Sequence, residues 1–143
     1  MTTQADYQRD GFVVCQDLIH ATTVQQLRDE TVAIACGQRG AIPGVTPRAQ
    51  ADPAALQDAL PIHFPHKVSA LMRQMLSHPA IVDVLTQLIG PDVKCMQSML
   101  FVKNAGKPGQ AWHQDETFIP THDASLTRVW IALDEATVDN GCL

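Results

Sequence analysis

Hydrophobic side chains recur at helical spacing through the first part of the chain. This period predicts three helices, with apolar faces in residues 24–35, 68–75 and 81–88. A shorter helix is expected to end at Asp10, because Gly11 follows it and breaks the helical backbone. The N-terminal part of the chain is therefore predicted to be a helical scaffold.

The first long helix has sequence signals at both of its ends. Thr23 and Gln26 fit a capping box, in which two side chains satisfy free backbone groups at a helix start. Gly37 follows the last apolar position and is a typical C-terminal stop. From Gly37 to Leu60 the chain is rich in Gly, Pro and polar residues. We expect a long surface loop there, with one helical turn at Pro53–Leu60.

After Pro91 the apolar positions alternate, as they do in strands that bury one face. Val93–Val102 is the longest predicted strand and Val129–Leu133 is another, and the apolar run Phe12–Cys15 predicts a third near the N-terminus. Asp139-Asn140-Gly141 is a tight-turn signal that should lead into a further strand. Helices followed by strands imply an α+β fold, in which helices pack against a sheet.

Composition and charge limit the classes of protein that fit the sequence. The 143 residues are 45% hydrophobic, which suits a single globular domain with its own core. A formal net charge of -5 without a run of Lys or Arg gives no electrostatic basis for binding nucleic acid. No membrane segment or signal peptide is visible, so we expect a cytoplasmic protein. The four cysteines lack CxxC spacing, which indicates reduced, mostly buried thiols rather than a zinc site.

The segment Trp112-His113-Gln114-Asp115 is the strongest candidate for a functional site. In a strand, positions i and i+2 point to the same face, so His113 and Asp115 can converge on one ion. A histidine and a carboxylate are two of the three ligands that hold non-heme ferrous iron. The same pair also fits a polar strand end followed by a turn, and the spacing alone does not decide between these roles.

Five segments, in their order along the chain, resemble the phytanoyl-CoA dioxygenase family of iron- and 2-oxoglutarate-dependent oxygenases. They are Tyr7–Val14, Gln97–Lys103, Trp112–Pro120, Val129–Thr137 and Asp139–Leu143. The resemblance extends from about Tyr7 to the last residue and is weakest in the loop that begins at Gly37. It implies a cupin-like jelly roll, or double-stranded β-helix, of which this chain contains the N-terminal helices and the first strands.

The resemblance also implies cofactors and site residues. The family binds Fe(II) and 2-oxoglutarate and uses O₂ to hydroxylate a small organic substrate. By this comparison His113 and Asp115 are iron ligands, with a neutral imidazole and an ionised carboxylate. Met99 and Trp130 match positions that line the 2-oxoglutarate pocket, although each also fits an apolar core. Gln114, between the two ligands, is a further candidate for cofactor binding, and its role there stays open.

The segment His63–Lys67 is the candidate for a basic contact with the cosubstrate. Some relatives place a basic side chain at this point, and the imidazole of His63 and the ammonium of Lys67 are able to bind a carboxylate. A solvated turn before a helix is the alternative interpretation.

Two further residues of the family's site are absent from this sequence. Relatives continue past the Asn-Gly-Cys-Leu turn to a Pro-Gly-Ser/Thr-His segment with the distal iron ligand, and then to an arginine that pairs with 2-oxoglutarate. We therefore interpret the chain as a fragment or shortened form with little oxygenase activity of its own. Two other classes stay open: an inactive jelly-roll module for binding or regulation, and a cupin-like metal enzyme that does not use 2-oxoglutarate. The sequence does not indicate the substrate or the oligomeric state.

Overall fold

The computed structural model of the chain describes residues 4–57, 61–103, 106 and 109–142. The chain divides into two compact units, Met1–Val102 and Lys103–Leu143. We call them the N-terminal unit and the C-terminal unit. Among the described residues, no helix is long and apolar enough to cross a membrane.

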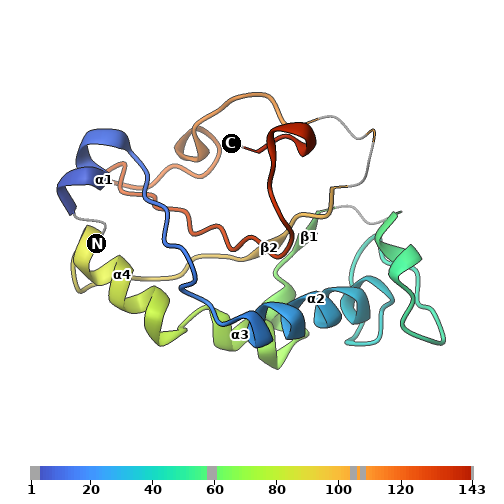
Figure 1. The fold of residues 1–143 in the computed structure, drawn as a ribbon. Coiled ribbons are helices and arrows are strands. Elements are labelled where there is room, and N and C mark those ends of the chain that lie inside the picture. The colour runs from blue at the N-terminus through green and yellow to red at the C-terminus, as the bar shows by residue number, and fades with distance from the viewer. Residues whose placement is uncertain (1–3, 58–60, 104–105, 107–108, 143) are drawn as a thin grey trace. The chain divides into compact units, whose positions relative to one another are not determined.

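The N-terminal unit contains the four α-helices that the described residues form (Figure 1). They are α1 (Gln4–Asp10), α2 (Ala21–Ala35), α3 (Ala70–Met75) and α4 (Pro79–Ile89). Their positions confirm the helices predicted from apolar spacing. The longest two bury residues of the predicted faces, namely Leu27, Thr31, Ile34 and Ala35 of α2 and Ile81 and Leu88 of α4.

The start of α2 differs from the predicted one. The helix begins at Ala21, and its N-cap is His20, whose ring nitrogen Nδ1 accepts a hydrogen bond of 3.2 Å from the backbone N–H of Thr22. The prediction of a capping box at Thr23 and Gln26 is therefore wrong, because Thr23 already lies inside the first turn. Histidine occupies the N-cap position here, where Ser, Thr, Asp or Asn is usual, so the common N-cap preferences do not predict it.

The end of α2 agrees with the stop predicted at Gly37. Gly37 has a left-handed φ of 70°, and its N–H bonds to the carbonyl of Ile34 at 2.9 Å. The N–H of Gln38 bonds to the carbonyl of Ala33 at 3.0 Å, which completes a Schellman motif. A Cβ at position 37 would lie 3.0 Å from the Cα of Pro47, so the following loop passes close to this glycine.

The loop after α2 folds back on the end of the helix. The Cys36 side chain is buried, and its sulfur lies 3.3 Å from the backbone nitrogen of Asp52, which donates to it. A 3₁₀ helix at Pro53–Gln57 follows, which confirms the predicted turn over its described part, and its Ala55 packs against Cys36. At the tip of the loop the N–H of Val45 bonds to the carbonyl of Ile42 in a turn through the left-handed Gly44.

One two-stranded antiparallel sheet is present in the described residues. Strand β1 (Ile62–His63) pairs with β2 (Met99–Leu100), with Ile62 opposite Leu100 and His63 opposite Met99 (Figure 1). Ile62 and Leu100 are buried, so one face of this short ladder belongs to the core. Of the predicted strand Val93–Val102, only Met99–Leu100 forms a strand.

Two of the predicted strands are wrong. Phe12–Cys15 and Val129–Leu133 have no strand assignment, and exposed apolar side chains occur in both, with Phe12 65% and Trp130 57% exposed. A strand needs a partner for its backbone groups, and apolar alternation does not supply one. Helices with a small sheet agree with the coarse α+β prediction, while the described residues do not confirm the double-stranded β-helix.

The C-terminal unit consists of irregular chain and two 3₁₀ helices, at Asp115–Thr117 and Val138–Asn140, over its described residues. Thr137 and Asn140 form a capping box around the second of these, and Gly141 leaves it with a left-handed φ of 85°. This geometry confirms the tight turn predicted at Asp139-Asn140-Gly141.

Candidate metal site

The side chains of His113 and Asp115 face each other in the C-terminal unit. Nε2 of His113 lies 3.3 Å from Oδ1 of Asp115. The predicted convergence is present, but its predicted cause is wrong, since neither residue lies on a strand. His113 is in irregular chain and Asp115 is the first residue of a 3₁₀ helix, so a local turn brings the two groups together.

The imidazole of His113 is oriented by the backbone. Its Nδ1 lies 2.6 Å from the carbonyl oxygen of Ala111, and because a carbonyl only accepts, Nδ1 is the donor of this hydrogen bond. A neutral ring then has its lone pair on Nε2, the nitrogen that faces Asp115. The ring of Phe118 packs edge-on against the imidazole at 5.3 Å between centroids. A metal-binding histidine needs such an acceptor, but the sequence does not identify it, because any residue type supplies a carbonyl at position 111.

The two donor atoms fit neighbouring positions on one metal ion. Ligand bonds of about 2.1 Å at right angles place two donors about 3 Å apart. The observed separation of Nε2 and Oδ1 is 3.3 Å. No group of three or more His, Cys, Asp or Glu able to hold a metal occurs among the described residues, which bring together two candidate donor side chains at this point.

Asp115 and the residue after it organise the chain that follows. Oδ2 of Asp115 lies 3.3 Å from Nη1 of Arg128. The carboxylate of Glu116 accepts hydrogen bonds from both the hydroxyl and the backbone N–H of Thr121, the first at 2.6 Å. It also accepts from the backbone N–H of Leu126 at 3.1 Å. The Thr121 hydroxyl and then its N–H lower the pKa of Glu116 below its usual range. We call residues 116–126 the Glu116 loop; sequence patterns did not single out Glu116 or Arg128.

The residues predicted to contact 2-oxoglutarate near the sheet lie together in the N-terminal unit. His63 and Met99 are opposite each other on β1 and β2, although they are far apart in sequence. The Nζ atom of Lys67 lies 4.5 Å from the centroid of the Phe64 ring, which also neighbours the His63 ring at 6.2 Å. Next to them, Nδ1 of His66 lies 2.7 Å from the Ser98 hydroxyl oxygen. Imidazole and ammonium groups therefore cluster at this ladder.

Gln114 and Trp130 lie in the C-terminal unit and are both exposed. Gln114 is the N-cap of the 3₁₀ helix at Asp115–Thr117, and its side chain makes no capping hydrogen bond. The exposure of Trp130 argues against its alternative role as plain core within this unit. The cosubstrate role of both residues stays a prediction.

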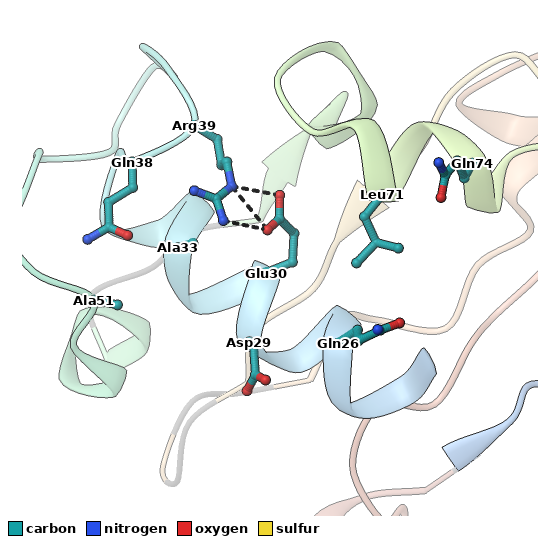
Figure 2. Close-up of a pocket in the computed structure, with 9 residues that line it drawn as sticks. All are labelled: Gln26, Asp29, Glu30, Ala33, Gln38, Arg39, Ala51, Leu71 and Gln74. Atoms are coloured by element: carbon teal, nitrogen blue, oxygen red, sulfur yellow. Dashed lines mark hydrogen bonds and ion pairs between the residues drawn. The ribbon is translucent and has the colours of Figure 1, made fainter. Parts of the chain in front are cut away.

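A separate groove of about 580 Å³ lies on the N-terminal unit (Figure 2). It is lined by Gln26, Asp29, Glu30, Ala33, Gln38, Arg39, Ala51, Leu71 and Gln74. Arg39 donates from both Nε and Nη2 to the Glu30 carboxylate, each at 2.9 Å, and this bond lowers the pKa of Glu30. The acid and the base neutralise each other, and no predicted site residue lines the groove.

Comparison with known proteins identifies relatives of this chain. A family model described as phytanoyl-CoA dioxygenase matches residues 7–143. Phytanoyl-CoA dioxygenase 1 of Oryza sativa subsp. japonica is 32% identical over 82 residues, which are 57% of this chain and 29% of that protein. Phytanoyl-CoA dioxygenase of Arabidopsis thaliana is 47% identical over 49 residues, which are 34% of this chain and 17% of that protein.

A third relative is the phytanoyl-CoA dioxygenase domain-containing protein 1 of Danio rerio. It is 33% identical over 85 residues, covering 57% of this chain and 28% of that protein. The chain thus spans less than a third of the length of the curated relatives it matches. No solved structure gives a significant match.

Proposed function

Because the chain belongs to the phytanoyl-CoA dioxygenase family, we propose that it contributes to an Fe(II)- and 2-oxoglutarate-dependent dioxygenase that hydroxylates a small organic substrate. Membership supports a dioxygenase-like function at the family level. The single observation that carries the finer proposal is the facing pair of donor atoms, Nε2 of His113 and Oδ1 of Asp115, at 3.3 Å. The resemblance assigns the same two residues to the iron.

The residues around the pair prepare it for a cation. The Ala111 carbonyl retains the imidazole proton on Nδ1, so the Nε2 lone pair of His113 is the donor. The guanidinium of Arg128 contacts Oδ2 of Asp115, the carboxylate oxygen that does not face His113. When bound here, iron supplies the chemistry in which O₂ oxidises 2-oxoglutarate to succinate and carbon dioxide and one oxygen atom enters a C–H bond of the substrate. In this proposal the chain itself orients two ligands, and a third is required for efficient turnover.

The cluster at the short sheet is the proposed contact for the cosubstrate. Lys67 provides a full positive charge beside the Phe64 ring, and His63 and Met99 face each other on the ladder beside it. A dicarboxylate needs such a local cation, because the chain as a whole has a net charge of -5. By the resemblance alone, Trp130 is a further candidate for contact with 2-oxoglutarate, and Gln114 is a candidate for cofactor binding.

Metal binding by the unchanged chain tests the proposal. Calorimetric titration with Mn²⁺, a redox-stable substitute for Fe²⁺, is expected to show weak binding that His113→Ala and Asp115→Ala each abolish. His122→Ala is the matched control, since this exposed histidine lies outside the pair. Equal Mn²⁺ binding by all four proteins would contradict the proposed site. Succinate formation should be low in the chain of 143 residues and high in a form extended at its C-terminus.

A further inference from the structure

Asp115 uses its two carboxylate oxygens differently. Oδ1 lies 3.3 Å from Nε2 of His113, and Oδ2 lies 3.3 Å from Nη1 of Arg128. Arginine is protonated at all working pH values and only donates, so its contact with Oδ2 does not depend on a bound metal to form. Oδ1 is therefore the oxygen that is available to a cation beside the imidazole.

The path of the Glu116 loop brings the Arg128 side chain beside the Asp115 carboxylate. The two residues are thirteen positions apart, and the chain between them folds around one carboxylate. Glu116 accepts from Thr121 and from the backbone N–H of Leu126. Since Glu116 directly follows Asp115 and Leu126 comes shortly before Arg128, these bonds join the start of the loop to its end. The hydroxyl of Thr121 also accepts from the N–H of Ser125 at 3.0 Å, which fixes the middle of the loop.

Resting on the proposed metal site, we infer that Arg128 is a positioning residue that makes Asp115 a monodentate ligand, and that Glu116 fixes the loop that places Arg128. A carboxylate can bind a metal through one oxygen or through both. With Oδ2 bonded to Arg128, Asp115 presents Oδ1 alone, on the side of His113.

The exposure of the Asp115–Arg128 pair separates this role from a structural one. The two side chains are 31% and 47% exposed, and ion pairs this accessible to water contribute little to folding stability. Loss of Arg128 should therefore change the direction of Oδ1 while the unfolding transition stays where it was. If Arg128 were only a structural residue, its loss would shift the unfolding transition and leave the direction of Oδ1 unchanged.

Binding of Co²⁺ provides the readout, because its visible absorption reports the number and arrangement of its ligands. We expect Arg128→Gln to weaken Co²⁺ binding by about 10-fold, as is typical when a group that orients a metal ligand is removed, and to change the spectrum. Arg128→Lys should restore part of the affinity, and Glu116→Gln should weaken binding less than R128Q. Arg9→Gln is the matched control, since Arg9 pairs with Asp10 at a similarly exposed position of α1.

The outcomes distinguish this inference from the proposed function. If R128Q and E116Q keep the affinity and the spectrum of the unchanged chain while H113A fails to bind Co²⁺, the metal site stands and the positioning role is refuted. If H113A binds as the unchanged chain does, the metal site and the ligand role fall together. The metal-free protein gives a second measurement: the ¹³C shift of the Asp115 carboxylate should change in R128Q and not in R9Q, and equal shifts would overturn the inference.

Discussion

The Arg39 guanidinium donates two hydrogen bonds of 2.9 Å, from Nε and Nη2, to the Glu30 carboxylate. Arg39 lies in the turn that follows α2, and Glu30 lies within that helix. The Glu30 side chain is 12% exposed and that of Arg39 is 42% exposed. The bond from Arg39 lowers the pKa of Glu30, so folding and ionisation of this carboxyl are linked.

We predict that the N-terminal unit loses stability in acid through Glu30. Because the folded state lowers this pKa, the stabilisation is complete above the unfolded value of about 4.3 and is lost as the pH falls through the lower folded value. Glu30→Gln should cost about 1 kcal/mol or less at neutral pH, since solvent screens Arg39. Urea unfolding at several pH values should show the difference between the two proteins shrinking below about pH 4. A difference that grows in acid would contradict this linkage.

The core contact of Ile34 predicts a large effect from truncation. Its side chain is fully buried on α2. Ile34→Ala should destabilise the folded chain by about 2 to 5 kcal/mol, and Ile34→Val by about 1 kcal/mol, because the larger deletion leaves a cavity. Val138→Ala, at an exposed position, is the control and should leave the urea midpoint unchanged. A midpoint for I34A equal to that of the control would show that this packing is absent.

Gly37 should tolerate no side chain. Its φ of 70° disfavours other residues, and a Cβ would lie 3.0 Å from the Cα of Pro47, a backbone atom that cannot rotate away. We expect Gly37→Ala to cost more than the roughly 1 kcal/mol that the left-handed conformation alone costs. Gly44→Ala is the matched control, because Gly44 has a similar φ and no neighbour within 4 Å of the added atom. Equal thermal shifts for both variants would refute the steric contribution of Pro47.

The cysteines should differ in reactivity under native conditions. Cys36 is fully buried and its sulfur accepts a hydrogen bond from the backbone N–H of Asp52, whereas Cys95 and Cys142 are exposed. The prediction that the thiols are mostly buried is therefore wrong. A thiol reagent should modify the two exposed cysteines quickly and Cys36 only at the rate of unfolding. Mass spectrometry of the labelled peptides measures this directly. Fast labelling at Cys36 would mean that the loop after α2 opens readily.

Lys67 predicts an effect on the proposed cosubstrate. In a C-terminally extended form that turns over 2-oxoglutarate, Lys67→Ala should raise the KM for 2-oxoglutarate by about 10-fold, because a charge-assisted contact is lost. The exposed Lys94→Ala is the control and should leave the KM unchanged. An unchanged KM in K67A would remove Lys67 from the proposed pocket.

The sequence predicts the helices well and the strands poorly, for a physical reason. Helical hydrogen bonds are local, so the apolar spacing in α2 and α4 and the glycine after each helix suffice to place them. A strand depends on a distant partner, and Val129–Leu133 has the right side chains without one in the described structure.

The candidate site also has a part that the sequence predicts and a part that it does not. The spacing of His113 and Asp115 predicted that their side chains converge, and they do. Their partners could not be predicted, because a backbone carbonyl at Ala111 has no sequence signature and Arg128 reaches Asp115 only through the path of the Glu116 loop.

The turn at Gly44 suggests a practical use for the chain as a carrier of reporters. The two ends of its loop are fixed, by the Schellman motif at Gly37 and by the hydrogen bond from the Asp52 N–H to the Cys36 sulfur, while no atom of the described residues lies within 4 Å of a Cβ added at Gly44. Doubling the length of a flexible loop costs only about 0.6 kcal/mol. An epitope or fluorophore peptide spliced in at Gly44 would therefore report on the protein without perturbing the helix behind it.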